Sequence, residues 1–153
     1  MFKSLIKILS TFFYVGYLPL IPGTFGSLAG IAVFYLVRAN PIALVSLTVI
    51  LIGIGFFVSG KTEQVMQKKD PSCVVIDEVC GMLLSLLFIP YDIRLVIAAF
   101  FLFRILDTLK PFPIGRLERL EGGLGIMCDD LAAGIYTNIV LQVVLRFTSF
   151  KTS

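Results

Sequence analysis

The sequence predicts an all-α protein, a polytopic membrane helical bundle with short, partly interfacial helices. Hydrophobic residues make up 58% of the 153-residue chain and charged residues only 15%, whereas soluble domains carry about 25% charged residues. Apolar segments alternate with polar or glycine- and proline-rich breaks, which is typical of a chain that crosses a bilayer several times. The length, without a linker-like stretch, indicates one membrane-embedded domain over residues 1–153.

The bundle is expected to consist of the apolar segments Phe25–Val37, Ile42–Ser59, Val79–Ile89, Leu95–Phe103 and Leu131–Phe147. Only the second and the last approach the ~20 residues that cross a ~30 Å hydrocarbon core alone. We expect the others to extend through flanking polar residues or to pair as broken helices inside the bundle. In residues 1–21, Lys3, Lys7, Gly16 and Pro19 interrupt an apolar stretch, so an interfacial N-terminal helix followed by a bend is expected there.

The breaks between these segments differ in character. Residues 22–27, 60–78 and 104–130 are polar or glycine-rich, whereas residues 38–41 and 90–94 form tight turns. If every segment crosses the membrane once, the three polar or glycine-rich breaks lie on one side of it and the two tight turns on the other. The side with the three breaks then holds these basic residues: Lys61, Lys68, Lys69, Arg104, Lys110, Arg116 and Arg119. The positive-inside rule places it in the cytoplasm.

The composition excludes several kinds of chemistry. The chain has no histidine, which rules out Ser-His-Asp triads, His-ligated zinc and the histidine-dependent type-2 phosphatidic acid phosphatases. Cys73, Cys80 and Cys128 lack metal-ligand spacing and are expected to be small buried hydrophobes in a reducing compartment. No Walker A loop, Asp-x-Asp motif or cysteine phosphatase loop occurs. A net charge of +3 without a basic cluster does not indicate a nucleic-acid partner.

Five of the ten acidic residues stand in or beside apolar helical sequence: Asp77, Glu78, Asp107, Asp129 and Asp130. A charge at membrane depth costs about 2.5 to 3.5 kcal/mol on insertion scales, so each position requires an explanation. One alternative is that each acid caps a helix N-terminus. Because the acids fall on one predicted face, we favour a carboxylate site for a hard cation such as Mg²⁺, in which one acid of a pair ligates and its neighbour orients water.

Arg104 and Lys110 supply positive charge beside these acids. Arg104 and Asp107 share a helix face at i,i+3 spacing, and Pro111 is expected to end the helix near Lys110. Two interpretations stay open. Arg104 and Asp107 form an internal ion pair while Lys110 extends to the membrane interface, or Arg104 and Lys110 together clamp a phosphate group.

Glycine-containing turns precede two predicted helices. Thr24 and Ser27 lie in the first turn, where they either cap the following helix or donate hydrogen bonds to an anion at its N-terminus. Gly26 and Gly30 form a small-residue face there that suits close helix packing. Residues 121–127 form the second turn, which can present backbone N–H groups to phosphate.

Four segments in order resemble the phosphatidylglycerophosphatase A family: residues 20–28 (LIPGTFGSL), 76–82 (IDEVCGM), 103–114 (FRILDTLKPFPI) and 122–134 (GGLGIMCDDLAAG). The resemblance covers residues 16–140, nearly the whole chain. Phe112 stands where the family commonly has Trp, and Glu121 stands where it frequently has His. The resemblance implies a bacterial inner-membrane, Mg²⁺-dependent enzyme of phospholipid biosynthesis that converts phosphatidylglycerophosphate to phosphatidylglycerol, with an active site facing the cytoplasm.

By position, the family's acidic and basic residues fall on the acids and bases named above. We expect metal ligation by Asp77, Glu78, Asp129 and Asp130, and phosphate binding by Arg104, Lys110, Thr24 and Ser27. The expected catalytic residues are Asp107, Asp129, Asp130, Lys110 and Arg104. Asp107 is a ligand, a base or a nucleophile, and the sequence leaves these roles open.

The expected partners are the phospholipid substrate and membrane lipids, without nucleic acid or an obligate protein partner. The alternatives are a membrane cation transporter that uses intramembrane carboxylates and a non-catalytic membrane scaffold. The basic residues Arg104 and Lys110 beside the acids count against a transporter, and a scaffold would leave the five acids without a role.

Overall fold

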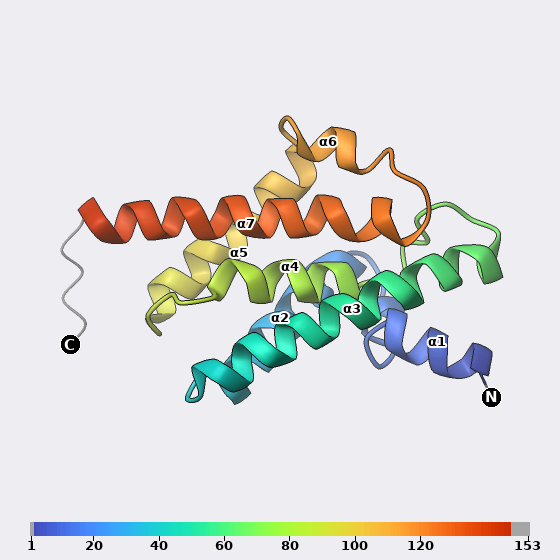
Figure 1. The fold of residues 1–153 in the computed structure, drawn as a ribbon, viewed down its shortest axis with the longest axis horizontal. Coiled ribbons are helices and arrows are strands. Elements are labelled where there is room, and N and C mark those ends of the chain that lie inside the picture. Colours follow the sequence, from blue (N-terminus) through green and yellow to red (C-terminus); the bar gives the residue numbers. More distant parts are fainter. Residues whose placement is uncertain (1, 148–153) are drawn as a thin grey trace.

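A computed structural model describes residues 2–147, and this part of the chain consists of helices joined by turns (Figure 1). In chain order these are α1 (Phe2–Ser10), the short 3₁₀ helix η1 (Val15–Tyr17), α2 (Pro22–Val37), α3 (Pro41–Met66), α4 (Ile76–Leu86), α5 (Ile93–Leu109), α6 (Ile114–Leu117) and α7 (Gly123–Phe147). The predicted all-α class is confirmed over these residues.

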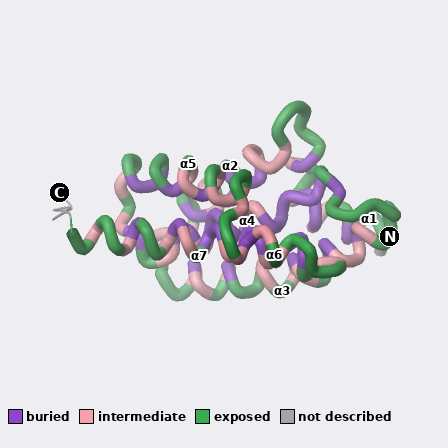
Figure 2. Tube along the Cα trace, turned by 90° about the horizontal axis from the view of Figure 1, so that it is seen from above, coloured by how far each residue is buried: buried purple, intermediate pink, exposed green. Residues whose placement is uncertain are grey.

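The short helix α4 lies at the centre of the bundle. It packs against α2, α3, α5 and α7, and nine of its eleven residues are buried. Figure 2 shows buried residues concentrated around it. On α7, a Cβ added to Gly134 would collide with the Gly81 carbonyl oxygen, and one added to Gly81 would lie 2.8 Å from the Asp130 carbonyl oxygen. This close approach brings the start of α4 beside the acids of α7.

Helix α2 approaches the other side of α4 through glycines as well. A Cβ on Gly26 or on Gly30 would lie 2.9 Å from the Cβ of Val75 or of Met82, respectively. The predicted small-residue face is therefore confirmed, and it packs against α4 and the residue preceding it.

Several helices are longer than the apolar segments from which they were predicted. Helix α2 begins at Pro22, since proline suits the first helical position. No side chain among the described residues caps it, so the alternative that Thr24 or Ser27 is the cap is wrong. Helix α7 begins at Gly123. Asp129 and Asp130 consequently lie inside the helix, and the alternative that they cap its N-terminus is wrong.

Helices α3 and α7 are the described helices long and apolar enough to cross a membrane. They correspond to the two segments for which a full crossing was predicted, and they run in opposite directions (Figure 1). Helix α4 is too short to cross alone. At the C-terminal end of α4, the side-chain amide of Asn138 on α7 donates hydrogen bonds to the carbonyl oxygens of Ser85 (3.1 Å) and Leu87 (2.7 Å), so it satisfies carbonyls that a helix end leaves without an intrahelical partner.

The N-terminal segment forms the expected short helix and bend. Helix α1 packs against α3, and the chain then turns through the left-handed residues Phe12, Phe13 and Tyr14 into η1. Its position at a membrane interface stays a prediction. Cys73 and Cys80 are buried as expected, whereas Cys128 is half-buried.

Candidate active site

A cavity of 240 Å³ lies where α4, α5 and α7 meet the start of α2. Its wall contains acids and bases from three of the sequence motifs: Asp77, Glu78, Arg104, Asp107, Lys110, Asp129 and Asp130. The structure therefore brings together residues that are separated by up to 53 positions in the sequence. This convergence makes the cavity the candidate active site.

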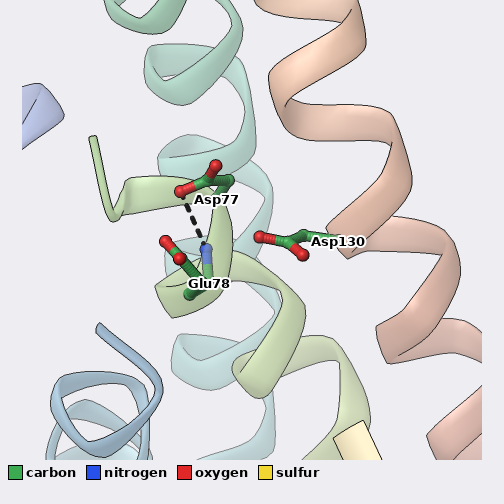
Figure 3. Close-up of side chains that lie close together, drawn as sticks. All are labelled: Asp77, Glu78 and Asp130. Atoms are coloured by element: carbon green, nitrogen blue, oxygen red, sulfur yellow. Dashed lines mark hydrogen bonds between the residues drawn. The ribbon is translucent and has the colours of Figure 1, made fainter. Parts of the chain in front are cut away.

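A compact carboxylate cluster forms one part of the wall. Asp77, Glu78 and Asp130 each present a carboxylate oxygen, and these oxygens lie within 4.8 Å of one another (Figure 3). Asp77 and Asp130 are only 6% and 4% exposed. Asp77 Oδ1 accepts a hydrogen bond from the Glu78 backbone N–H at 3.1 Å, which fixes its orientation at the first turn of α4.

Two oxygens of this cluster are unsatisfied. Within residues 2–147, Glu78 Oε2 and Asp130 Oδ1 are buried without a hydrogen-bond partner. Buried carboxylates that are close together and unpaired repel one another and lose their hydration. A divalent cation with a preference for oxygen ligands would relieve both effects. The donor set consequently fits a Mg²⁺ ion.

Asp129 binds a lysine, whereas its neighbour Asp130 belongs to the carboxylate cluster. Asp129 Oδ2 accepts a hydrogen bond from Lys110 Nζ at 2.9 Å, and Lys110 Nζ also lies 2.9 Å from Glu118 Oε1. Burial lowers the pKa of Lys110, but its hydrogen bonds to Asp129 and Glu118 outweigh this effect and raise the pKa above the ordinary value. Lys110 therefore stays positively charged, and its ammonium group turns toward Asp129 and Glu118.

Arg104 and Asp107 form the predicted i,i+3 ion pair, with 2.6 Å between Nη1 and Oδ2. Both residues also line the cavity, so the ion pair does not remove Arg104 from the site. The first turn of α2 lies against this pair, because a Cβ on Gly23 would come within 3.2 Å of the Arg104 guanidinium and would collide with Glu78 Oε1. Glycine at this position lets α2 approach the charged wall.

The hydroxyl residues of α2 lie elsewhere. Ser27 is fully buried, and its Oγ donates to the Gly23 carbonyl oxygen at 3.0 Å. From α2 and the residue before it, the cavity wall contains Ile21, Pro22 and Gly23, and not Thr24 or Ser27. Phosphate binding by these two hydroxyls stays a prediction.

Sequence reasoning missed Asp70, Ser72 and Glu118. Asp70 and Ser72 line the cavity from the loop before α4, and Glu118 reaches Lys110 from the end of α6. Asp70 is exposed as a whole, but partial desolvation of its carboxylate at the cavity raises its pKa, and the charge of Lys110 opposes this shift. These acids stand in polar breaks among basic residues. No periodicity indicated that the two breaks fold over the same cavity.

The cavity therefore combines a carboxylate cluster with two cationic side chains. Such a combination suits a phosphoryl group, since a metal ion and fixed positive charges can share its negative oxygens.

Comparisons with known proteins agree with this chemistry. The family model described as phosphatidylglycerophosphatase A matches residues 8–145. The chain is 41% identical over 140 residues to phosphatidylglycerophosphatase A of Escherichia coli, covering 90% of this chain and 81% of that protein. It is 39% identical over 143 residues to phosphatidylglycerophosphatase A of Haemophilus influenzae, covering 91% and 88%.

A further relative carries a different name. The chain is 37% identical over 145 residues to a putative phosphatidylinositol-3-phosphatase of Bacteroides thetaiotaomicron, covering 89% of this chain and 91% of that protein. No solved structure shows a significant match.

Proposed function

The chain belongs to the phosphatidylglycerophosphatase A family, and from this premise we propose that it hydrolyses the terminal phosphomonoester of phosphatidylglycerophosphate to give phosphatidylglycerol and inorganic phosphate. The observation that carries the proposal is the single cavity in which Asp77, Glu78 and Asp130 lie beside Arg104 and Lys110. This reaction would serve phospholipid biosynthesis.

We assign Mg²⁺ to the cluster of Asp77, Glu78 and Asp130, because a cation bound there would satisfy the buried oxygens that lack a hydrogen-bond partner among the described residues. When bound, the ion would neutralise phosphate charge and acidify a water molecule. Asp129, which the sequence also suggested as a ligand, holds Lys110 in this structure. Its proposed role here is to position that ammonium group toward the cavity.

Lys110 and Arg104 would bind the phosphoryl oxygens. Lys110 has three N–H donors, and its carboxylate partners Asp129 and Glu118 leave one donor available. Arg104 has five donors, one of which engages Asp107. Donors fixed in this way can stabilise the charge of the transition state without reorganising.

Asp107 has three open roles besides orienting Arg104. It lies in the cavity wall, so it can act as a further metal ligand, as the base for the attacking water or as a covalent nucleophile. Trapping of a phosphoenzyme in rapidly quenched reactions would identify the nucleophile. Absence of a phosphoenzyme, together with inversion of configuration at a chiral phosphorus, would show direct attack by water and exclude the nucleophile role.

The proposed location is a bacterial inner membrane, with several crossings and the site facing the cytoplasm. The apolar helices α3 and α7 support membrane association, and exposed Leu20 and Ile21 adjoin the cavity at the start of α2. There the acyl chains can remain among apolar side chains while the headgroup enters the site. The comparisons give no support to the cation-transporter alternative.

Phosphate release by the purified protein in detergent micelles tests the proposal. Wild type is expected to release phosphate from phosphatidylglycerophosphate with Mg²⁺ and not with excess EDTA. Asp77→Asn and Asp130→Asn are expected to lose at least about 100-fold in kcat, as enzymes do when a group that stabilises the transition state is removed. Asp92→Asn is the matched control, because Asp92 caps α5 at its N-terminus, outside the cavity wall. Full metal-dependent activity in both cluster variants contradicts the site assignment.

A further inference from the structure

A second chamber adjoins the active-site cavity, and the chemistry described so far does not use it. It has a volume of 360 Å³ and shares two wall residues, Asp70 and Ile126, with the cavity. It lies between the last turns of α3, the loop before α4, the residues after α6 and the first turn of α7. Its charged wall residues are Glu63, Lys69, Asp70, Glu118 and Arg119.

The charges of the chamber wall do not favour a second phosphate. Acids outnumber bases among its charged residues, so the wall as a whole repels an additional anion. The wall instead mixes hydrogen-bond donors (Lys69 and Arg119) with acceptors (Glu63, Asp70 and Glu118). Hydroxyl groups suit such a wall, since each one donates a hydrogen bond and also accepts.

Glu63 contributes an unsatisfied hydrogen-bond acceptor to the chamber wall. Its Oε2 is buried without a hydrogen-bond partner among the described residues, and its side chain lines the chamber from helix α3. A buried acceptor of this kind is destabilising unless a donor reaches it. A ligand hydroxyl in the chamber would provide that donor, and Arg119 in the same wall offers N–H groups to the hydroxyl oxygens.

We propose that this chamber binds a free hydroxyl of the polyol that carries the scissile phosphate, with Glu63 as acceptor and Arg119 as donor, while the phosphodiester that joins this polyol to diacylglycerol stays outside the chamber. The inference rests on the proposed function and extends it to specificity. In phosphatidylglycerophosphate the phosphate is carried by a glycerol, and in a phosphatidylinositol phosphate by an inositol. In phosphatidic acid the phosphate is attached directly to diacylglycerol, so no free hydroxyl enters the chamber. The enzyme therefore selects lipids whose phosphate is carried by a polyol.

The test compares Glu63→Gln and Arg119→Ala with wild type on phosphatidylglycerophosphate and phosphatidic acid in the same Mg²⁺-containing micelles. Loss of one hydrogen bond to a charged side chain reduces kcat/KM on the polyol substrate about tenfold, while kcat/KM on phosphatidic acid changes less than about twofold. Matched controls are Arg116→Ala and Glu121→Gln, which lie outside the chamber wall; they keep wild-type values on both lipids. Unchanged melting temperatures exclude misfolding.

The activities on the two lipids distinguish failure of the polyol subsite from failure of the proposed function. Equal losses on both lipids, or values within about twofold of wild type on phosphatidylglycerophosphate, overturn the polyol subsite while the proposed function stands. A wild-type protein that releases no phosphate from phosphatidylglycerophosphate overturns the proposed function itself. Phosphatidylinositol 3-phosphate distinguishes the two polyols. A parallel loss on this lipid indicates general polyol binding, and a loss confined to phosphatidylglycerophosphate indicates glycerol.

Discussion

Replacing Asp130 with asparagine is expected to stabilise the metal-free protein and, at the same time, to abolish phosphatase activity. Asp130 belongs to a carboxylate cluster whose oxygens lie within 4.8 Å of one another, and Asp130 Oδ1 is buried without a partner among residues 2–147. Asparagine has nearly the same shape and carries no charge. The substitution therefore removes repulsion from Asp77 and Glu78 while it leaves the packing of α4 against α7 intact.

The size of the effect follows from the geometry. Two unit charges no more than 4.8 Å apart repel by at least about 3.5 kcal/mol at an effective dielectric constant of about 20. Buried acids escape part of this repulsion by binding protons, so we expect a gain of about 1 to 3 kcal/mol in the metal-free state. For a chain of this length each kcal/mol corresponds to a rise of about 2 to 4 °C in melting temperature.

Thermal unfolding in detergent, followed by circular dichroism, measures this effect in EDTA and in saturating Mg²⁺. Wild type is expected to melt higher with Mg²⁺, by the equivalent of about 2.7 kcal/mol at 100 times the dissociation constant. Asp130→Asn is expected to melt above wild type in EDTA and to gain little from Mg²⁺. Asp92→Asn, as the control, keeps the wild-type response. An Asp130→Asn protein that melts below wild type in EDTA, together with a wild type insensitive to Mg²⁺, refutes the electrostatic argument and the metal assignment together.

Three further substitutions test separate parts of the structure. Gly81→Ala forces α4 away from α7 and is expected to destabilise the protein by about 1 to 3 kcal/mol, measured as a lower melting temperature with loss of activity. Lys110→Ala leaves Asp129 unpaired and removes a phosphate donor, so kcat/KM is expected to fall about 10- to 100-fold, with partial recovery in Lys110→Arg. Asn138→Leu frees two carbonyl oxygens at the end of α4 and is expected to destabilise by about 1 to 3 kcal/mol, with little change in the KM of the folded fraction.

The sequence revealed the chemical groups of the site better than their partners. Charged residues are rare in this apolar chain, so each acid beside an apolar segment could be recognised as a candidate site residue. The acids and bases of the motifs do line one cavity. The sequence could not predict which of Asp129 and Asp130 joins the carboxylate cluster and which binds Lys110. Neighbouring helical residues differ by about 100° in direction, and the orientation of α7 in the bundle decides which one faces α4. Glu118 was missed for a related reason, since its partner Lys110 is brought near only by the turn through α6.

Helix boundaries were predicted less well than helix identity. Apolar residues end where a helix leaves the core or the lipid, whereas a helix continues while its backbone hydrogen bonds can form. Residues 121–127 contain three glycines, which suggested a turn. From Gly123 on they are helical in the structure, and Gly123 and Gly125 fit against the Phe56 and Leu120 carbonyl oxygens, where a Cβ would collide. Tertiary contact therefore overrides the local preference at the start of α7.

The same glycine contacts explain why a destabilised carboxylate cluster can persist in this fold. Asp77 belongs to α4 and Asp130 to α7, and the repulsion between them would be relieved if these helices separated slightly. The contact between Gly81 and Gly134 prevents this separation only as long as the packing gained at a close helix crossing exceeds the repulsion. A bulkier residue at either glycine removes that gain and lets the acids move apart. The glycines and the acids of the two motifs consequently act together, and substitutions at Gly81 and Asp130 are expected to be non-additive in melting experiments, because Gly81→Ala already releases part of the repulsion that Asp130→Asn removes.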